Sequence, residues 1–151
     1  MKEKAGIILI CNIEEEIKVA IVQTRCQGND KWGLPKGSKK KKEPIFECAK
    51  RELYEETGIK LDKIAYKQLG KRKIYNITFF ICKVCESHDL NPIDKHEIKD
   101  AKWMSVKEIK SLNNTQINRT LRKKNKKKSN TLISSIINTY SKKFDLFNIY
   151  K

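Results

Sequence analysis

Residues 31–59 read "KWGLPKGSKKKKEPIFECAKRELYEETGI", and this segment organises the rest of the chain. A lysine-rich loop with glycines and a proline leads into a helix-like segment that ends on a cluster of glutamates. The sequence predicts a helix that begins near Glu43 with Pro44 at its first position, where a missing N–H costs nothing. The helix should end at Gly58, because glycine is the usual residue just beyond a helix end.

Three glutamates of this predicted helix, Glu52, Glu55 and Glu56, are spaced i, i+3 and i+4 and therefore share one face. Like charges at this spacing repel one another. A divalent cation such as Mg²⁺ or Mn²⁺ removes that penalty, because both ions prefer carboxylate and carbonyl oxygen ligands. The glutamates alone leave a second interpretation open, an ordinary acidic surface that Arg51 and Lys60 partly neutralise.

The residues around the glutamates resemble the Nudix box. Gly37 is followed after five residues by Glu43, and after seven more by "RELYEETGI" at residues 51–59, which matches every fixed position of the box. The resemblance implies an α/β fold, an α/β/α sandwich with a mixed sheet, and hydrolysis of a pyrophosphate linked to a nucleoside-like group. It extends in general layout over residues 4–112 and does not cover the tail.

The resemblance also implies roles for residues of the box. Mg²⁺ or Mn²⁺ would be bound by carboxylates and one backbone carbonyl, namely Glu52, Glu55, Glu56 and the carbonyl of Lys36. Arg51 would orient a carboxylate, Gly37 would permit a tight loop, and Glu43 would brace the helix. Glu52, Glu56 and Arg51 are therefore expected to act in catalysis.

Three stretches resemble the catalytic domain of the mRNA decapping enzyme: "WGLPKGS", "ECAKRELYEETG" and "HEIKDAKWMSVKEI". This resemblance implies capped RNA as the partner and release of 7-methylguanosine diphosphate. In the decapping family, a glutamate in the loop before the last strand is a metal ligand and the general base, which must reach the attacking water. Glu97 in "HEI" matches that position. Glu97 could instead be a surface residue, with Asp94, Asp100 or Glu86 as other candidates.

Basic and aromatic residues near the box are candidates for substrate binding. Lys36 and Lys39, with the following lysines to residue 42, would attract a chain of phosphates. Trp32 is the candidate for stacking on the cap base. A basic run at residues 119–128 would follow the RNA backbone, with the contacts expected from Lys123, Lys124, Lys126 and Lys127. The same run also fits a localisation signal or a linker.

The cellular decapping enzyme carries a helical regulatory domain before its catalytic domain, and this sequence shows no counterpart. We therefore expect a compact stand-alone decapping hydrolase, like those of some large DNA viruses, acting in the cytoplasm, which for a virus is the host's. The alternative is a Nudix hydrolase of small substrates: diadenosine polyphosphates, nucleoside triphosphates or inositol pyrophosphates. A non-catalytic RNA-binding protein on the same scaffold ranks lower, because all box glutamates are present.

Composition limits the remaining possibilities. Among 151 residues, 34 Lys and Arg against 18 Asp and Glu give a formal charge of +16, which favours polyanionic partners. An AT-rich genome would also enrich lysine, so part of the excess can be codon bias. No apolar run is long enough to span a membrane, and the N-terminal "MKEKAGIILICN" lacks a signal-peptide cleavage site. The five cysteines lack the regular spacing of a disulfide framework, which fits a reducing compartment. The two cysteines of "CKVC" are better explained as residues of a strand than as half of a zinc site.

The chain divides by pattern into two parts. We expect a Nudix hydrolase domain over residues 1–118 and a basic C-terminal helical extension over residues 119–151, packed on the domain or trailing it. Within the domain, "AGIILICN" and "IKVAIVQTR" read as strands joined by a turn, and "GKRK" as the turn of a second hairpin. "AKWMSV" reads as a strand and "SVKEIKSL" as a helix capped by Ser105. In the tail, "TLISSIINTYSKKF" has the apolar spacing of a helix.

Overall fold

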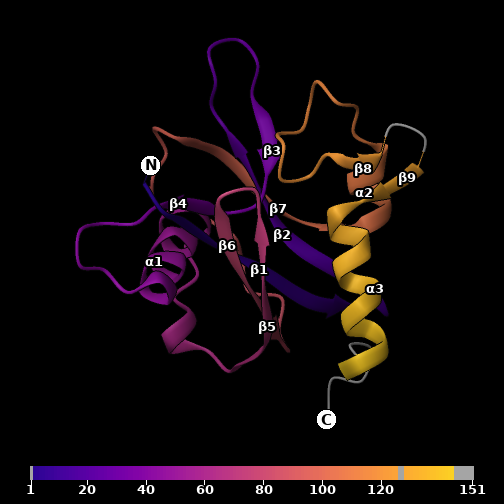
Figure 1. Ribbon diagram of the computed structural model, residues 1–151, viewed down its shortest axis with the longest axis horizontal. Helices are drawn as coiled ribbons and strands as arrows, with labels where there is room; N and C mark the ends of the chain where they lie inside the picture. The colour runs from indigo at the N-terminus through magenta and orange to yellow at the C-terminus, as the bar shows by residue number, and fades with distance from the viewer. Residues whose placement is uncertain (1, 126–127, 145–151) are drawn as a thin grey trace.

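A computed structural model describes residues 2–125 and 128–144 of the chain. One mixed sheet lies between α1 on one face and α2 and α3 on the other (Figure 1). Its strand order is β3-β2-β1-β6-β5, with β4 paired to β1 and β7 paired to β2. The β1–β6 pair is parallel and the other pairs are antiparallel. The α/β/α sandwich predicted from the sequence is confirmed.

The strands of this sheet are β1 (Lys4–Ile13), β2 (Glu16–Thr24), β3 (Lys31–Gly33), β4 (Lys36–Ser38), β5 (Tyr66–Ile74), β6 (Ile77–Val84) and β7 (Ile98–Ser105). The helices are α1 (Ile45–Thr57), the 3₁₀ helix η1 (Leu61–Lys63), α2 (Val106–Ser111) and α3 (Leu132–Phe144). A separate hairpin joins β8 (Lys123–Asn125) and β9 (Lys128–Thr131). The loop predicted before the helix therefore contains two short strands, β3 and β4.

The central strand β1 is apolar from Ala5 to Cys11, where both of its faces are buried. Ile8 and Ile10 belong to the cluster on the α2 and α3 side, and Ile7 and Leu9 belong to the cluster beneath α1. Side chains of a strand point alternately to opposite faces, so one continuous apolar run serves two cores.

Helix α1 ends where the sequence predicted. Gly58 follows its last residue with a left-handed φ of 79°, and its N–H donates to the carbonyl of Tyr54. Pro44 precedes the first helical residue by one position instead of occupying it. Ala49 and Leu53 are buried against the sheet, which leaves the acidic side of the helix facing the loop before it.

The predicted second turn was wrong. Residues 70–73, "GKRK", lie inside β5. The glycine belongs to a β-bulge between Gln68 and Gly70, not to a turn. The chain reverses at Tyr75, which has a φ of 56°, between the paired residues Ile74 and Ile77. The capping box of α2 at Ser105 and Glu108 is present, as the sequence predicted for Ser105.

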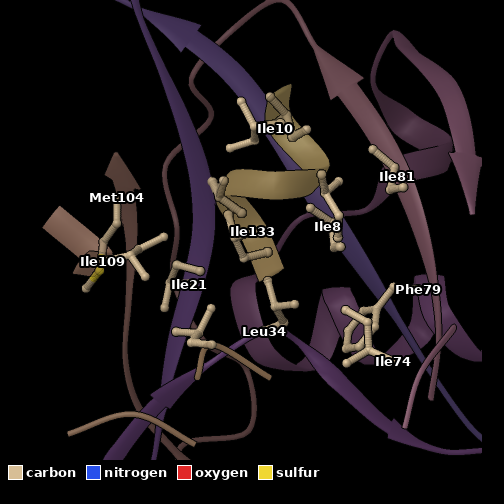
Figure 2. Close-up of a cluster of buried hydrophobic side chains, with 14 of the residues drawn as sticks. Ile8, Ile10, Ile21, Leu34, Ile74, Phe79, Ile81, Met104, Ile109 and Ile133 are labelled. Atoms are coloured by element: carbon tan, nitrogen blue, oxygen red, sulfur yellow. The ribbon is translucent and has the colours of Figure 1, made fainter. Parts of the chain in front are cut away.

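The C-terminal helix shares the main core. Ile133 of α3 is buried in the same cluster as Ile8 and Ile10 (Figure 2). Ile136 and Ile137 belong to that cluster as well. The helix expected here is confirmed. Within its described residues, the basic run before this helix contains no helix, and it includes β8 and the first residue of β9, which pair as a hairpin. Lys126 and Lys127 lie outside the described residues, and so do the side chains of Lys123 and Lys124.

The cysteines are free thiols. Cys11, Cys48 and Cys82 are buried, whereas Cys26 and Cys85 are exposed. Burial raises the pKa of Cys11 and Cys48 to about 11 and that of Cys82 to about 12, so these thiols stay protonated and pack as small hydrophobes. Within the described ranges, no helix is long and apolar enough to cross a membrane.

Candidate active site

The loop before α1 lies close against both the sheet and the helix because of two glycines. β4 pairs antiparallel with β1, and Gly37 is opposite Ala5 in that register. A Cβ at Gly37 would overlap the carboxylate of Glu52, and one at Gly6 would overlap the carbonyl oxygen of Pro35. This approach is possible only because neither glycine carries a side chain.

Arg51 is the centre of a charge network that joins the loop to three glutamates. Its Nε and Nη2 donate to the two carboxylate oxygens of Glu43 at 2.8 and 3.0 Å, a bidentate pair. Its Nη1 donates to Glu52 Oε1 at 2.9 Å and to Glu55 Oε1 at 3.1 Å. A further bond from Nη2 to the carbonyl of Ser38, at 3.0 Å, ties the guanidinium to β4. Arg51 thereby fixes carboxylate positions on one side of the site.

Glu43 serves the loop and not the pocket. Hydrogen bonds from Arg51 lower the pKa of Glu43 to about 2, and the backbone N–H of Lys40 adds to the effect through a 3.0 Å bond. The same pair raises the pKa of the Arg51 guanidinium. Glu43 is therefore ionised in the folded protein and braces the start of α1.

Glu56 is a carboxylate in a nearly dry position. Its residue is 3% exposed, and its Oε1 accepts a 3.0 Å hydrogen bond from the backbone N–H of Lys36. The pKa of Glu56 is raised to about 9, mainly by burial and also by the charges of Glu97 and Glu52, while the hydrogen bond from the Lys36 N–H and the Lys36 charge oppose the rise. The position therefore favours the protonated carboxyl group.

Glu52 is buried beside it, whereas Glu55 is more open. Glu52 is 8% exposed, and burial raises its pKa with help from the charges of Glu55 and Glu97, against the effect of Arg51. The side chain of Glu55 is 36% exposed and is paired with Arg51. The three box glutamates thus differ in surroundings although they share one helix.

The loop that carries Glu97 is anchored on the last turn of α1. The N–H groups of Ile93 and Asp94 donate to the carbonyl of Glu55 at 3.0 and 2.9 Å, which satisfies a carbonyl at the helix end. The carboxylate of Asp94 accepts from the backbone N–H of Glu97 at 3.1 Å, and the carbonyl of Glu97 accepts from the backbone N–H of Arg25 at 2.8 Å. These bonds fix the backbone of Glu97, while its side chain remains exposed.

A pocket of about 200 Å³ lies between these elements. Glu56, Glu97 and Lys36 line it together with the buried Leu34. The structure therefore brings Glu97 to the same pocket as Glu56, although the two are far apart in sequence. Burial lowers the pKa of the Lys36 ammonium, with the charge of Lys4 as the next cause.

The donor set is suited to a hard divalent cation, because it consists of carboxylate oxygens, of which those of Glu56 and Glu97 line the pocket. As the described side chains stand, no group of three or more His, Cys, Asp or Glu residues surrounds a common point. The reason is visible in the hydrogen bonds: Arg51 holds Glu52 and Glu55, and the Lys36 N–H holds Glu56. A cation would compete with Arg51 for these oxygens.

The other residues that the sequence predicted to bind substrate differ in how exposed they are. Trp32 is 8% exposed and belongs to the core cluster, so its ring has little free surface for a stacked base. Lys39 is half-buried and donates to the carbonyl of Lys40, and the lysines at 40–42 are exposed beside the loop.

Sequence reasoning missed one segment of the site. Residues 116–121 run along β3: the backbone N–H of Trp32 donates to the carbonyl of Gln116 at 2.8 Å, and the backbone N–H of Asn118 donates to the carbonyl of Trp32 at 2.9 Å. Asn118 also lines the pocket, and its side chain fills the space over Gly33. No local motif marks these residues, because their role depends on pairing with a strand more than 80 positions earlier.

The sequence matches a known family model and several known proteins. The family model described as NUDIX domain matches residues 1–124. Nudix hydrolase 7 of Arabidopsis thaliana is 34% identical over 113 residues, which are 69% of this chain and 39% of that protein. Phosphatase NudJ of Escherichia coli K12 is 27% identical over 115 residues, 74% of this chain and 75% of that protein. The chain spans between about a fifth and two fifths of the length of the plant relatives it matches.

Solved structures share the fold. The binary complex of a C. elegans Ap4A hydrolase has a TM-score of 0.56 at 19% identity and covers 71% of this chain and 82% of that chain. The NUDIX domain of Shewanella oneidensis NrtR, complexed with ADP ribose, has a TM-score of 0.56 at 19% identity and covers 75% and 78%. At these identities, the likeness establishes the architecture only.

Proposed function

The chain belongs to the Nudix family, and we propose on that basis that it is a metal-dependent hydrolase of a phosphoanhydride bond in a small nucleotide substrate. One observation carries the proposal: the buried carboxylate of Glu56 shares a pocket with Glu97 and Lys36. A carboxylate with a pKa of about 9 is stable there without a proton only when added positive charge offsets it.

Mg²⁺ or Mn²⁺ held by Glu52, Glu55, Glu56 and Glu97, with the carbonyl of Lys36, would supply Lewis-acid stabilisation of phosphate oxygens and a more acidic bound water. The chain's own residues do the rest. Glu97, fixed by its backbone and exposed at its carboxylate, accepts a proton from the attacking water at Oε. The ammonium of Lys36 attracts the phosphate chain, and Arg51 keeps the neighbouring carboxylates oriented.

Small substrates are favoured over capped RNA. NudJ bears the name phosphatase, one structural relative is an Ap4A hydrolase, and another was solved with ADP ribose. Of the small substrates predicted from the sequence, a diadenosine polyphosphate or a nucleoside triphosphate requires the least binding surface outside the described pocket. A pocket of about 200 Å³ is smaller than the ~300–1,000 Å³ of sites that bury a whole drug-sized ligand, so it accepts one end of the substrate.

Capped RNA is retained as a second candidate because of the charge. A formal charge of +16, with seven Lys and Arg residues between positions 119 and 128, attracts a long polyanion. The relatives named above give decapping no support, and it remains a prediction from the sequence.

The test is a substrate panel with Mg²⁺ or Mn²⁺ and product identification by mass spectrometry. The panel contains diadenosine tetraphosphate, nucleoside triphosphates, ADP-ribose, an inositol pyrophosphate and capped RNA. The proposal predicts metal-dependent cleavage of a small anhydride at a higher kcat/KM than that for the cap. Preferential release of 7-methylguanosine diphosphate from RNA would establish decapping, and no cleavage of any compound would refute both.

A further inference from the structure

A second cavity lies at the C-terminal end of α1 and shares no lining residue with the active-site pocket. Its volume is about 360 Å³, against about 200 Å³ for the active-site pocket, and it falls within the ~300–1,000 Å³ of small-molecule sites. Its walls come from α1, from the segment after that helix and from the loop that carries Glu97, and they include Tyr54, Lys60, Lys63, Ile64, His88 and Asp89.

The rim of this cavity carries positive charge. Lys60 Nζ lies 4.9 Å from the centroid of the Tyr54 ring, which holds the ammonium beside the cavity. Lys63 is exposed, and its ammonium has no hydrogen bond or ion pair within the described part of the chain. The described lining residues contain one carboxylate, that of Asp89, against these two ammonium groups. The cavity therefore favours an anion.

The inner wall of the same cavity is apolar. Ile59 lines it and is 4% exposed, as a member of the core cluster beneath α1. Ile64 is half-buried and packs against that cluster, and the half-buried ring of Tyr54 adds aromatic surface. An inorganic anion would leave this surface unused. The lining is suited to an anion that is attached to a small apolar group.

The end of a helix normally disfavours an anion, because its last carbonyls are unpaired. Here these carbonyls are occupied. That of Tyr54 accepts from the N–H of Gly58 at 2.8 Å, and that of Thr57 accepts from the N–H of Asn91 at 2.8 Å. The carbonyl of Glu55 accepts from Ile93 and Asp94, as described above. The three donors at positions 91–94 belong to the loop that carries Glu97, so this loop is both a cap for the helix and a wall of the cavity.

We propose that this cavity binds a small organic phosphate, with the phosphate at Lys60 and Lys63 and the apolar part against Tyr54 and Ile64. A ligand that contacts both walls must leave before the loop can separate from α1, so its binding stabilises the attached loop. The site would regulate catalysis through Glu97, a consequence that rests on the proposed hydrolase function. The binding itself does not depend on that function.

The test uses phenyl phosphate, inorganic phosphate and phenol as probes of the full-length protein in NMR titrations. EDTA is present, so that no metal can hold a phosphate at the box glutamates. Phenyl phosphate should bind about 10-fold more tightly than inorganic phosphate, because its ring covers apolar surface. Phenol should bind more weakly than phenyl phosphate, because it lacks the phosphate group. The amide signals of Tyr54, Lys63 and His88 should shift on binding.

Matched lysine variants locate the probe. Lys63→Gln should weaken phenyl phosphate binding by about 5-fold or more. Lys107→Gln removes the same charge from an exposed position on α2, across the sheet, and should change the affinity by less than about 2-fold. Lys36→Gln should also leave the affinity unchanged. Loss of binding in Lys36→Gln with none in Lys63→Gln would place the probe in the active-site pocket and overturn the proposal.

Hydrogen exchange tests the link to the loop without any turnover. With phenyl phosphate at ten times its Kd, exchange of the Asn91, Ile93 and Asp94 amides should slow by up to about 11-fold, and Lys63→Gln at the same concentration should show a smaller effect. These results would support the proposal even if the protein hydrolyses no anhydride, and that failure would then concern the proposed function alone. No saturable binding, equal affinities of the wild type and Lys63→Gln, or unchanged exchange of the three amides would overturn it.

Discussion

The backbone N–H of Lys36 donates a 3.0 Å hydrogen bond to Oε1 of Glu56, and this bond joins β4 to the last turns of α1. Oε1 of Glu56 can accept this bond whether the carboxyl group is ionised or protonated. The bond therefore has a structural role that does not depend on the charge of the group. A glutamine at the same position keeps that acceptor and loses only the ionisable oxygen. The structural and chemical roles of Glu56 can therefore be separated by one substitution.

Glu56→Gln should abolish hydrolysis without unfolding the protein. The amide keeps the bond from Lys36 and matches the protonated acid in size, so the melting temperature should be unchanged or higher at neutral pH. Turnover should fall by more than about 10-fold, because stabilisation by a bound metal contributes several kcal/mol. Steady-state rates and thermal melts of both proteins, with Mg²⁺, Mn²⁺ or EDTA, make the comparison. Retention of more than about a tenth of the wild-type rate, or full activity in EDTA, would remove the metal-ligand assignment.

Glu56 also makes the stability of the metal-free protein depend on pH. Burial raises its folded-state pKa from 4.5 to about 9. Between these values, the folded protein holds a proton that the unfolded chain has released, so the free energy of unfolding should fall as pH rises from about 5 to 9. Because a metal favours the ionised carboxylate, added Mg²⁺ should stabilise the protein more at pH 9 than at pH 6. Urea titrations across this range measure the slope, and Glu56→Gln should flatten it; equal slopes would show that Glu56 is not the group responsible.

Loss of the Arg51 guanidinium should be costly. Arg51→Met keeps the aliphatic stem but leaves Glu43, Glu52 and Glu55 without their shared donor, which should cost about 2–4 kcal/mol of unfolding free energy. The matched control is Lys50→Met on the same helix, whose partners are largely exposed, and that change should cost less than about 1 kcal/mol. Chemical denaturation measures both. Similar losses for the two variants would contradict a special role for Arg51.

Much of the carboxylate-rich side of the candidate site was predictable, because it rests on local spacing. The i, i+3, i+4 glutamates, the glycine at 37 and the arginine at 51 lie within one loop and one helix, where sequence distance fixes spatial distance. The sequence analysis also placed Glu97 at the site, and the structure brings that residue to the pocket of Glu56.

The misses involve tertiary pairing. Trp32 was expected to face a substrate, but β3 packs beneath residues 116–121 and the ring enters the core. The turn at 70–73 was misassigned because a glycine at a bulge looks like a glycine in a turn until the partner strand is known. Asn118 and Thr120 went unnoticed for the same reason, since a distant loop supplies their partners.

The basic run should be tested by substitution and not by truncation. Cutting after Asn118 would remove Leu121 and the α3 residues Ile133 and Ile136, all buried in the core. Replacing the five lysines between positions 123 and 128 with glutamine keeps all of these buried residues in the chain. If three or four of these contact phosphate, the slope of log affinity for capped RNA against log salt should flatten by about two to three units. Binding of an isolated cap dinucleotide serves as the control and should not change; identical RNA slopes would show that the lysines do not bind RNA.

The central claim is that Glu97 acts chemically in the pocket that it shares with Glu56. Single-turnover and steady-state hydrolysis of the best small substrate by Glu97→Gln, beside Asp100→Asn on the adjoining strand, tests it most directly. We predict that kcat for Glu97→Gln falls by about two to four powers of ten with little change in substrate affinity. Asp100→Asn, whose carboxylate bonds the N–H of Ala101 and does not line the pocket, should retain nearly full activity. An unchanged kcat in Glu97→Gln would contradict the account.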